Sequence, residues 1–368
     1  MAAPESKSRA ATDPTPAAPQ KNDPKRTGPV WQSQARAVSM ASAYNGEMES
    51  AASVSSPTVA VLGEAVFDFA HIPSGAYDFS GHPGGSPLNV AVAAARQGQP
   101  TTALTQFSND MFGTALLEHL TANGVDTSLS SRSNDPTALA FVSQDEAGNS
   151  HFQFVANGSA DKRWNPQPRP TLPSSVRFMQ ISSLTLFEEP GASTAFDIVG
   201  SCTDRVAILF DPTYRPALIP SRERFLAVLD ALLPSLTFLK PSDQDLEFLY
   251  PGVDPHEVCA DWLARGVPAV ILTLGPKGSV LLRRGREPVA APSVPIEIID
   301  TIGAGDTFTG TLFAQLIERT AEVGPDWRSL DDRSWREALR WANQAAAITC
   351  QRPGCDPPTR AEVATATS

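Results

Sequence analysis

Short runs of apolar, often β-branched residues alternate along most of the chain with longer stretches whose apolar positions recur every three or four residues. The short runs predict buried β-strands, and the longer stretches predict helices. The predicted strands are residues 58–62, 102–107, 177–181, 206–210, 236–239 and 269–274. The first two predicted helices, residues 88–97 and 111–123, each end before a glycine, Gly98 and Gly124. Such alternation is typical of βαβ units, so the sequence predicts an α/β fold around a central, mostly parallel sheet.

Two neighbouring strand patterns interrupt this alternation. Residues 137–144 and 150–155 flank the turn segment 145–149 (DEAGN), which is typical of a β-hairpin and not of a helical crossover. Together with residues 67–79, this hairpin is predicted to form a small sheet that projects from the main domain. Such an appendage is a natural candidate for a lid over a binding site.

The composition changes once, near residue 57. Residues 1–56 are rich in Ala, Ser, Pro and Gln and contain only isolated large apolar residues, so we expect a disordered leader. Acidic residues near the N-terminus argue against a transit peptide. Met40 or Met48 remains an alternative first residue of the protein.

The charge balance and the cysteines narrow the class of protein. Twenty-nine Lys and Arg against 40 Asp and Glu give a formal charge of -11, which argues against nucleic acid or an anionic membrane as the main partner. Four cysteines are too few for a disulfide framework. No apolar stretch approaches the ~18–20 residues of a membrane span. We therefore expect a soluble, cytoplasmic protein in which any phosphate site is built locally.

The most specific motif is DTIGAGDTFTG, residues 300–310. It lies between a strand-like run, residues 296–299, and an apolar helix pattern, residues 307–317. Gly303 and Gly305 permit tight turns and close approach of a ligand to the backbone. At a helix start, the free N–H groups of such a loop converge on a small space, and the helix dipole also favours negative charge there. The motif therefore predicts an anion hole.

Asp306 lies at the same predicted helix start. The backbone N–H groups of Gly303, Ala304 and Gly305 would stabilise charge on a transferred phosphoryl group, while the Asp306 carboxylate would take the proton from an attacking hydroxyl. The simpler alternative is an N-cap aspartate after a glycine turn. The full eleven-residue string between a predicted strand and helix favours phosphoryl transfer.

This string resembles the C-terminal signature of the PfkB (ribokinase-like) carbohydrate kinase family. Further segments resemble the family's motifs in the expected order: GEAVFD (63–68), GGSPLN (84–89), DPTYRP (211–216), KPSDQD (240–245), TLGPKG (273–278) and WANQAAA (341–347). The DPTYRP segment is similar to that of the fructokinase-like branch. The resemblance implies a three-layer α/β/α sandwich with a small β-sheet lid.

The resemblance places sugar-binding residues in the first part of the chain. Asp68 is expected at the end of the first strand, where open α/β sheets bind ligands. Gly84 and Gly85 would let the backbone approach the sugar, and Asn89 would donate and accept hydrogen bonds from the first helical turn. Arg215 suits a bidentate phosphate contact, although a surface ion pair is the simpler alternative.

The nucleotide side is implied by the later motifs. The family resemblance assigns it Lys240, Ser242, Thr273, Gly275, Gly278 and Asn343. Ser242 and Asp245 stand where the family usually has Asn and Glu in a motif that organises magnesium, and Thr213 replaces another usual Asn. Because Mg²⁺ keeps several water ligands, the shorter Asp245 carboxylate is expected to act through water.

These features lead us to expect ATP-dependent transfer of the γ-phosphoryl group to a primary hydroxyl of a sugar, with fructose as the expected acceptor. The family resemblance implies Mg²⁺, allows K⁺, and suggests a homodimer through the lid. A kinase for 2-keto-3-deoxygluconate, ribose or a nucleoside stays open, as does a catalytically weak nucleotide-binding scaffold. A dinucleotide-dependent oxidoreductase would need G-x-G-x-x-G after the first strand, which residues 62–68 lack. The predicted organisation is a leader over residues 1–56, a kinase domain over 57–360 with its lid at about 67–83 and 137–156, and a C-terminal tail over 361–368.

Overall fold

The computed structural model of the chain describes residues 56–72, 78–144, 150–214, 218–219, 221–323 and 326–367. Contacts separate the chain into two units, Met1–Ser53 and Val54–Ser368, and every described residue belongs to the second. The predicted leader, apart from its last residue Ser56, therefore lies outside the described residues. No helix in the described part of the chain combines the length and apolar character needed to cross a bilayer.

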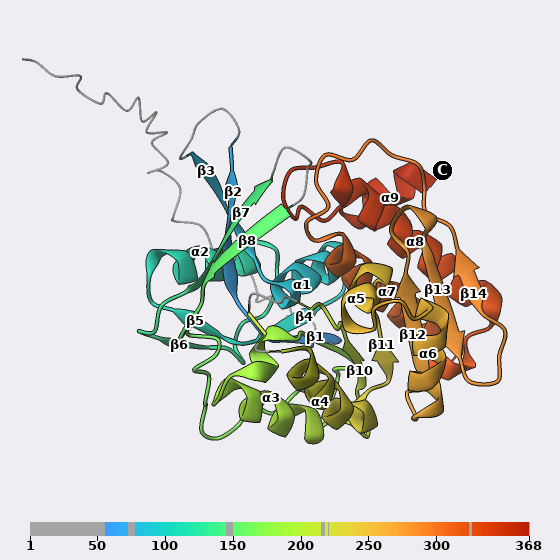
Figure 1. Cartoon of the computed structure of the whole chain (residues 1–368), viewed down its shortest axis with the longest axis horizontal. Coiled ribbons are helices and arrows are strands. Elements are labelled where there is room, and N and C mark those ends of the chain that lie inside the picture. Colours follow the sequence, from blue (N-terminus) through green and yellow to red (C-terminus); the bar gives the residue numbers. More distant parts are fainter. Residues whose placement is uncertain are drawn as a thin grey trace, which may run out of the picture. The chain divides into compact units, whose positions relative to one another are not determined.

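A twisted eight-stranded sheet forms the centre of this unit (Figure 1). Its strands, in spatial order, are β14 (Val289–Ala291), β13 (Ser279–Arg283), β12 (Ala269–Thr273), β11 (Phe238–Leu239), β10 (Ala207–Phe210), β9 (Phe178–Ile181), β1 (Val59–Leu62) and β4 (Thr101–Leu104). The strands from β12 to β4 are parallel, whereas β13 and β14 pair antiparallel at one edge. The predicted central, mostly parallel sheet is confirmed.

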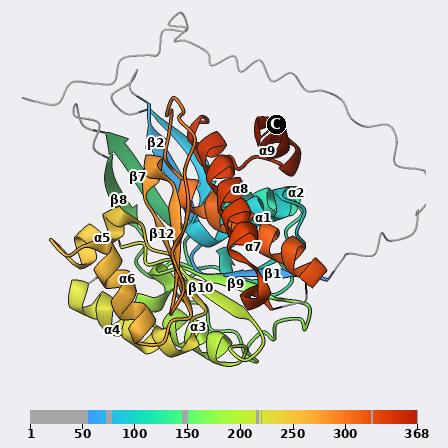
Figure 2. The ribbon, with the colours of Figure 1, turned by 90° about the vertical axis from the view of Figure 1, so that its right-hand side faces the viewer.

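Helices cover both faces of the sheet, as Figure 2 shows. One layer contains α1 (Ser86–Arg96), α2 (Met111–Ala122), α7 (Ala304–Val323) and α8 (Asp332–Cys350), and the other contains α3 (Gly191–Gly200), α4 (Arg222–Leu232), α5 (Asp243–Leu249) and α6 (Pro255–Ala264). Alternate residues of β10 belong to different cores: Leu209 packs with Phe313 of α7, and Ile208 and Phe210 pack with Phe225 of α4. Burial on both faces explains why the strands are apolar throughout, and the three-layer α/β/α arrangement is confirmed.

A separate four-stranded sheet projects from this sandwich (Figure 1). Its order is β3 (Phe79–Gly84), β2 (Val66–His71), β7 (Ala138–Gln144) and β8 (Ser150–Val155). The predicted hairpin is present as the antiparallel pair β7 and β8, although its turn, residues 145–149, lies outside the described residues. A further short pair joins β5 (Gln106–Ser108) to β6 (Ser131–Ser133).

Three local predictions need correction or comment. The predicted strand over residues 296–299 is wrong: the segment joins no sheet, and Ile298 and Ile299 are exposed. The nearby prolines Pro292 and Pro295 cannot donate to a ladder, which disfavours a strand here despite the apolar run. The predicted strand 102–107 is divided into β4 and β5. Most of the predicted C-terminal tail lies in α9 (Arg360–Thr367), whose Val363 is fully buried.

Candidate active site

The aligned strands bring a row of polar residues to one edge of the central sheet. Leu62 is opposite Ile181, Ile181 is opposite Phe210, and Phe210 is opposite Leu239. The next residue along the chain is, in the same order, Gly63, Ser182, Asp211 and Lys240. Ligands of open α/β sheets bind at the carboxyl ends of the strands, so this row marks the expected position of a site.

The first turn of α7 lies at this edge and carries the predicted anion-hole residues. The helix begins at Ala304, so Gly303 precedes it while Gly305 and Asp306 lie in its first turn. Gly303 has a φ of 74°, in the left-handed region that glycine tolerates. A Cβ atom at Gly303 would overlap the Sγ atom of Cys355. The close approach therefore depends on glycine, and the helix start offers N–H groups without intrahelical partners.

The carboxylate of Asp306 is held by the first turn of α1. Its Oδ1 accepts a hydrogen bond from Ser86 Oγ at 2.6 Å, and its Oδ2 accepts one from Asn89 Nδ2 at 2.9 Å. Burial raises the pKa of Asp306 above its ordinary value, and the two hydrogen bonds oppose that rise by stabilising the ionised form. The predicted base Asp306 and the predicted sugar residue Asn89 are thus in direct contact. Ser86 was not predicted, although it lies within the GGSPLN segment.

A buried ion pair borders the same helix turn. Lys240 Nζ lies 2.6 Å from Asp211 Oδ2, and the two side chains are only 3% and 8% exposed. A Cβ atom at Gly305 would lie 3.5 Å from Lys240 Nζ, so the ammonium group is beside the predicted anion hole. The negative charge of Asp211 raises the pKa of Asp306 and the positive charge of Lys240 lowers it. Asp211 was not predicted, although its place directly after a predicted strand was a usable signal.

The position predicted for Asp68 needs correction. The first strand, β1, ends at Leu62, and Asp68 lies within β2 of the small sheet, opposite His82 of β3. A Cβ atom at Gly84 would overlap the Asp68 carboxylate, so this carboxylate packs directly against the glycine. The structure therefore brings the predicted sugar residues Asp68 and Gly84 together, but on the lid and not on the central sheet.

A cavity of about 310 Å³ lies between the small sheet and the loop before α7, residues 300–303, which we call the anion loop. It is lined by Asp68 and His82 from the small sheet, by Asp300 before α7, and by Cys355 after α8. Asp300 fixes this junction, because its carboxylate accepts hydrogen bonds from the backbone N–H groups of Ile302 and Gly354 at 3.0 and 2.9 Å. Burial raises the pKa of the Cys355 thiol well above its ordinary value. The small sheet contributes both polar and apolar side chains to the cavity, which also adjoins Cys355, the residue that packs on Gly303.

The predicted nucleotide residues Ser242 and Thr273 meet at the carboxyl ends of β11 and β12. They form an isolated parallel bridge, and Thr273 Oγ1 donates to the carbonyl of Pro241 at 3.2 Å. Ser242 caps α5: its Oγ accepts a hydrogen bond from the Asp245 N–H group at 3.0 Å, and the Asp245 carboxylate accepts hydrogen bonds from Ser242 and from Tyr214 N–H at 3.3 Å. Asp245 is therefore oriented by a capping box.

The other predicted nucleotide residues lie around the turn after β12. Gly275 and Gly278 both have positive φ, 53° and 99°, and they flank this tight turn. Asn343 of α8 donates from Nδ2 to the carbonyls of Ala291 and Pro292, at 3.0 and 3.3 Å. A Cβ atom at Gly278 would overlap the Ala291 carbonyl, so Asn343 supports the strand against which this turn packs. Its contact with nucleotide stays a prediction, and Arg215 lies outside the described residues.

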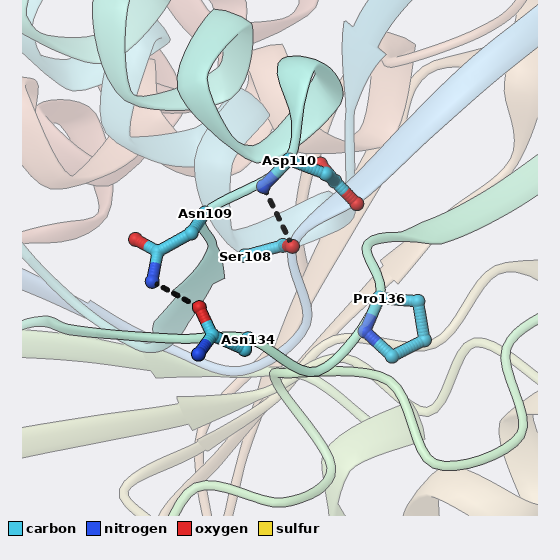
Figure 3. A pocket seen from close by; sticks show the side chains of 5 residues that line it. All are labelled: Ser108, Asn109, Asp110, Asn134 and Pro136. Atoms are coloured by element: carbon cyan, nitrogen blue, oxygen red, sulfur yellow. Dashed lines mark hydrogen bonds between the residues drawn. The ribbon is translucent and has the colours of Figure 1, made fainter.

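A second, more open pocket of about 400 Å³ contains none of the predicted residues (Figure 3). Ser108, Asn109, Asp110, Asn134 and Pro136 line it. Asn109 Nδ2 donates to Asn134 Oδ1 at 2.8 Å, and the Asp110 N–H group donates to Ser108 Oγ at 3.0 Å. Asp110 also caps α2 by accepting from Gly113 N–H. Polar side chains that line this pocket thus already have hydrogen-bond partners within the protein.

Comparisons with known proteins agree with this geometry. Residues 56–362 match the family described as pfkB family carbohydrate kinase. The chain is 32% identical to fructokinase-1 of Oryza sativa subsp. japonica over 84% of its own length and 97% of the relative, and 29% identical to a fructokinase of Rhizobium leguminosarum bv. trifolii over 74% and 84%. Its fold resembles a Vibrio cholerae O395 fructokinase crystallised with fructose, ADP and calcium, with a TM-score of 0.71, 25% identity and coverage of 84% and 98%. The chain belongs to the pfkB family of carbohydrate kinases.

Proposed function

We propose that the protein is a fructokinase that transfers the γ-phosphoryl group of ATP to a primary hydroxyl of fructose. The observation that carries this proposal is the position of Asp306, which two side chains of α1 hold at the anion loop of α7. Each carboxylate oxygen has two lone pairs, so Asp306 can still accept a hydrogen bond from a substrate hydroxyl.

The reaction needs one proton transfer and one exchange of phosphorus–oxygen bonds. Asp306 accepts the proton as the sugar oxygen bonds to the γ-phosphorus, and the bond from that phosphorus to the ADP oxygen breaks. The N–H groups around Gly303, Ala304 and Gly305, with Lys240 beside them, stabilise the charge on the transferred group. Closure of the small sheet over the sugar would exclude water, which otherwise competes as the phosphoryl acceptor.

The choice of fructose rests on the relatives. Curated relatives at about 30% identity over most of the chain are named fructokinases, and the Vibrio cholerae neighbour was crystallised with fructose and ADP. The cavity beside Asp68 supports a polyol ligand, because a carboxylate and an imidazole from neighbouring strands can bind adjacent hydroxyls. We propose Asp68, Gly84, Gly85 and Asn89 as the sugar contacts.

Magnesium is proposed to accompany ATP. No group of three or more His, Cys, Asp or Glu side chains within the described ranges could hold a metal ion by itself. This arrangement fits Mg²⁺, which in kinases is bound largely by nucleotide phosphates and water with one or two carboxylates. Asp245 would hold it through water; the ion would neutralise charge on the phosphates. Loss of turnover in EDTA and its recovery with MgCl₂ would test this requirement.

A homodimer through the lid is also proposed. Phe67 and Phe69 flank Asp68 in β2, so they project from the face of the lid opposite Asp68. Phe69 stacks on Phe141 with centroids 5.0 Å apart, and Phe79, which is 41% exposed, contacts Phe141 at 5.6 Å. Phe67 and Phe69 also contact Phe112 of α2, at 5.1 and 5.6 Å, so exposed Phe79 is the part of this face that a second copy would cover. Light scattering of the wild type and of Phe79→Ser would measure the association.

The proposal also includes a potassium ion and a cytoplasmic location. Potassium as an additional cation rests on the family resemblance, and comparison of turnover in KCl with turnover in tetramethylammonium chloride measures it. A cytoplasmic location is supported by the four cysteines, all of which are free thiols.

An ADP-release assay with Mg-ATP tests the main proposal directly. The acceptors are fructose, ribose, 2-keto-3-deoxygluconate and adenosine, each at the same concentration. Fructose should give the highest kcat/KM. A higher value with another acceptor would replace fructose as the substrate and leave the kinase assignment intact.

A further inference from the structure

Glu64 is a buried acid that the proposed reaction does not use. It is only 4% exposed and lies in the turn that joins β1 of the central sheet to β2 of the lid. Its carboxylate accepts a hydrogen bond from Ser182 Oγ, the first residue after β9. Among the residues that the structure describes, no ion pair joins Glu64 to a cation. A buried carboxylate without a cationic partner is costly, so its retention calls for a physical reason.

The turn that contains Glu64 packs directly beneath the first turn of α1. A Cβ atom at Gly85 would lie 2.9 Å from the Glu64 carbonyl oxygen. A Cβ atom at Gly63 would lie 2.7 Å from Pro87 Cγ and would overlap Ser182 Oγ. The turn is thus confined between Ser182 and α1, with no room for a larger backbone shift. Gly85 directly precedes Ser86, which donates to Asp306. The position of the turn that contains Glu64 therefore determines the position of the hydrogen bond from Ser86 to Asp306.

Several charged groups face these two carboxylates from different elements. Glu64 interacts with Asp306 of α7 and with Asp161, a buried acid after β8 that accepts a hydrogen bond from Ser159 Oγ at 2.5 Å. Burial raises the pKa of Glu64 to about 7, and the Ser182 hydrogen bond opposes that rise.

The groups that face Asp306 are more numerous. They are the Ser86 and Asn89 donors of α1, the Asp211 and Lys240 ion pair, and the Cys355 thiol, which interacts with the Asp306 charge. Lys240 is the cation among them, and it is already paired with Asp211. The donors of α1, Ser86 and Asn89, therefore stabilise the ionised form of Asp306.

We infer that Glu64 is a positioning residue for phosphoryl transfer: through its hydrogen bond with Ser182 it fixes the turn beneath α1 that aligns Ser86 with Asp306. The inference rests on the proposed role of Asp306 as the general base. It adds no chemical step, because the proton still moves from the sugar hydroxyl to Asp306. Loss of the Ser86 alignment would weaken a hydrogen bond that stabilises ionised Asp306, so removal of the Glu64 carboxyl group should raise the pKa of Asp306.

The test compares Glu64→Gln, Glu64→Ala and Ser182→Ala with the wild type and with Glu287→Gln, a control on an exposed turn. The first readout is kcat for fructose phosphorylation from pH 5 to 9. Glu64→Ala and Ser182→Ala, which remove the hydrogen bond between the two side chains, should move the acid limb of kcat to higher pH by about half a pH unit or more, with little change in KM for ATP. The Gln side chain of Glu64→Gln can still accept the hydrogen bond from Ser182, so its acid limb should stay close to that of the wild type.

A second readout separates this inference from the proposed substrate. Carbon-13 NMR of protein labelled at the Asp side-chain carboxyls follows the titration of Asp306 without any acceptor, and Asp306→Asn assigns the signal. The pKa of Asp306 should be higher in Glu64→Ala than in the wild type. An unchanged pKa, or a kcat that falls equally at every pH in a folded variant, would overturn the inference. Absence of fructose turnover with a shifted Asp306 titration would overturn the substrate proposal and leave the inference standing.

Discussion

Replacement of Ser86 by alanine isolates the hydrogen bond that stabilises ionised Asp306. Ser86 Oγ donates to Asp306 Oδ1 at 2.6 Å, a distance typical of an O–H donor to a carboxylate. A hydrogen bond to a charged group contributes about 1.5–3 kcal/mol. One pKa unit corresponds to about 1.36 kcal/mol, so its loss should raise the pKa of Asp306 by about one to two units.

The sign of the kinetic effect follows from the role of the base. As the proposed general base, Asp306 must be ionised to accept the proton, and its pKa is already raised by burial. A further rise moves the acid limb of kcat to higher pH. At a pH below both pKa values, raising the pKa by one lowers the ionised fraction about tenfold, and the difference fades once the pH exceeds both values.

The assay is kcat against pH for the wild type, Ser86→Ala and Ser86→Thr, which retains the hydroxyl. We expect the alanine variant to lose activity mainly at low pH, with the threonine variant close to the wild type. An acid limb that stays in place or moves to lower pH in Ser86→Ala would refute the reasoning, because the serine would then not stabilise the ionised base.

Three further changes test other contacts. Lys240→Met leaves Asp211 buried without its ion-pair partner, which lies 2.6 Å away in the wild type. Urea unfolding should therefore show a loss of about 3–5 kcal/mol in the free energy of unfolding. If the double variant Lys240→Met/Asp211→Asn does not recover stability, the ion pair is not the cause of that loss. Gly84→Ala forces the Asp68 carboxylate aside, so KM for fructose should rise while KM for ATP stays the same in initial-rate measurements; equal rises in both would point to a general distortion. Burial raises the pKa of Asp110, but hydrogen bonds from Gly113 and Thr137 outweigh it and hold that pKa below its ordinary value. Its stabilising effect is therefore present at neutral pH and lost as the pH falls through the folded-state pKa. Thermal melts of Asp110→Asn should show a weaker loss of Tm in acid than the wild type does, and parallel curves would contradict this origin.

The fold was predictable because its signals are local. The β-branched runs, the glycines that end helices and the hairpin pattern each depend on neighbouring residues, and they identified the sheet and the lid. One exception is residues 296–299, an apolar run that joins no sheet and follows Pro292 and Pro295, which cannot donate to a ladder.

The residues of the site were predictable from the sequence only where they belong to a continuous motif. The anion loop with Asp306 is a continuous string, whereas Ser86 reaches Asp306 across 220 positions of sequence. Asp211 and Glu64 likewise acquire their partners from the strand register, which aligns residues far apart in the chain. Asp68 was predicted at the end of the first strand, whereas the pairing of β2 with β3 and β7 places it in the small sheet. Long-range pairing of this kind is not encoded in local pattern.

The central claim is that Asp306 is the general base of a fructose kinase, and one measurement tests it most directly. Fructose-dependent ADP release is measured with Mg-ATP for the wild type and Asp306→Asn, together with ATP binding by calorimetry. We predict turnover in the wild type, loss of most of it in the variant, and ATP affinity that is nearly unchanged, because the proposed nucleotide contacts lie on other groups. Undiminished turnover in Asp306→Asn, or its loss together with ATP binding, would contradict the account.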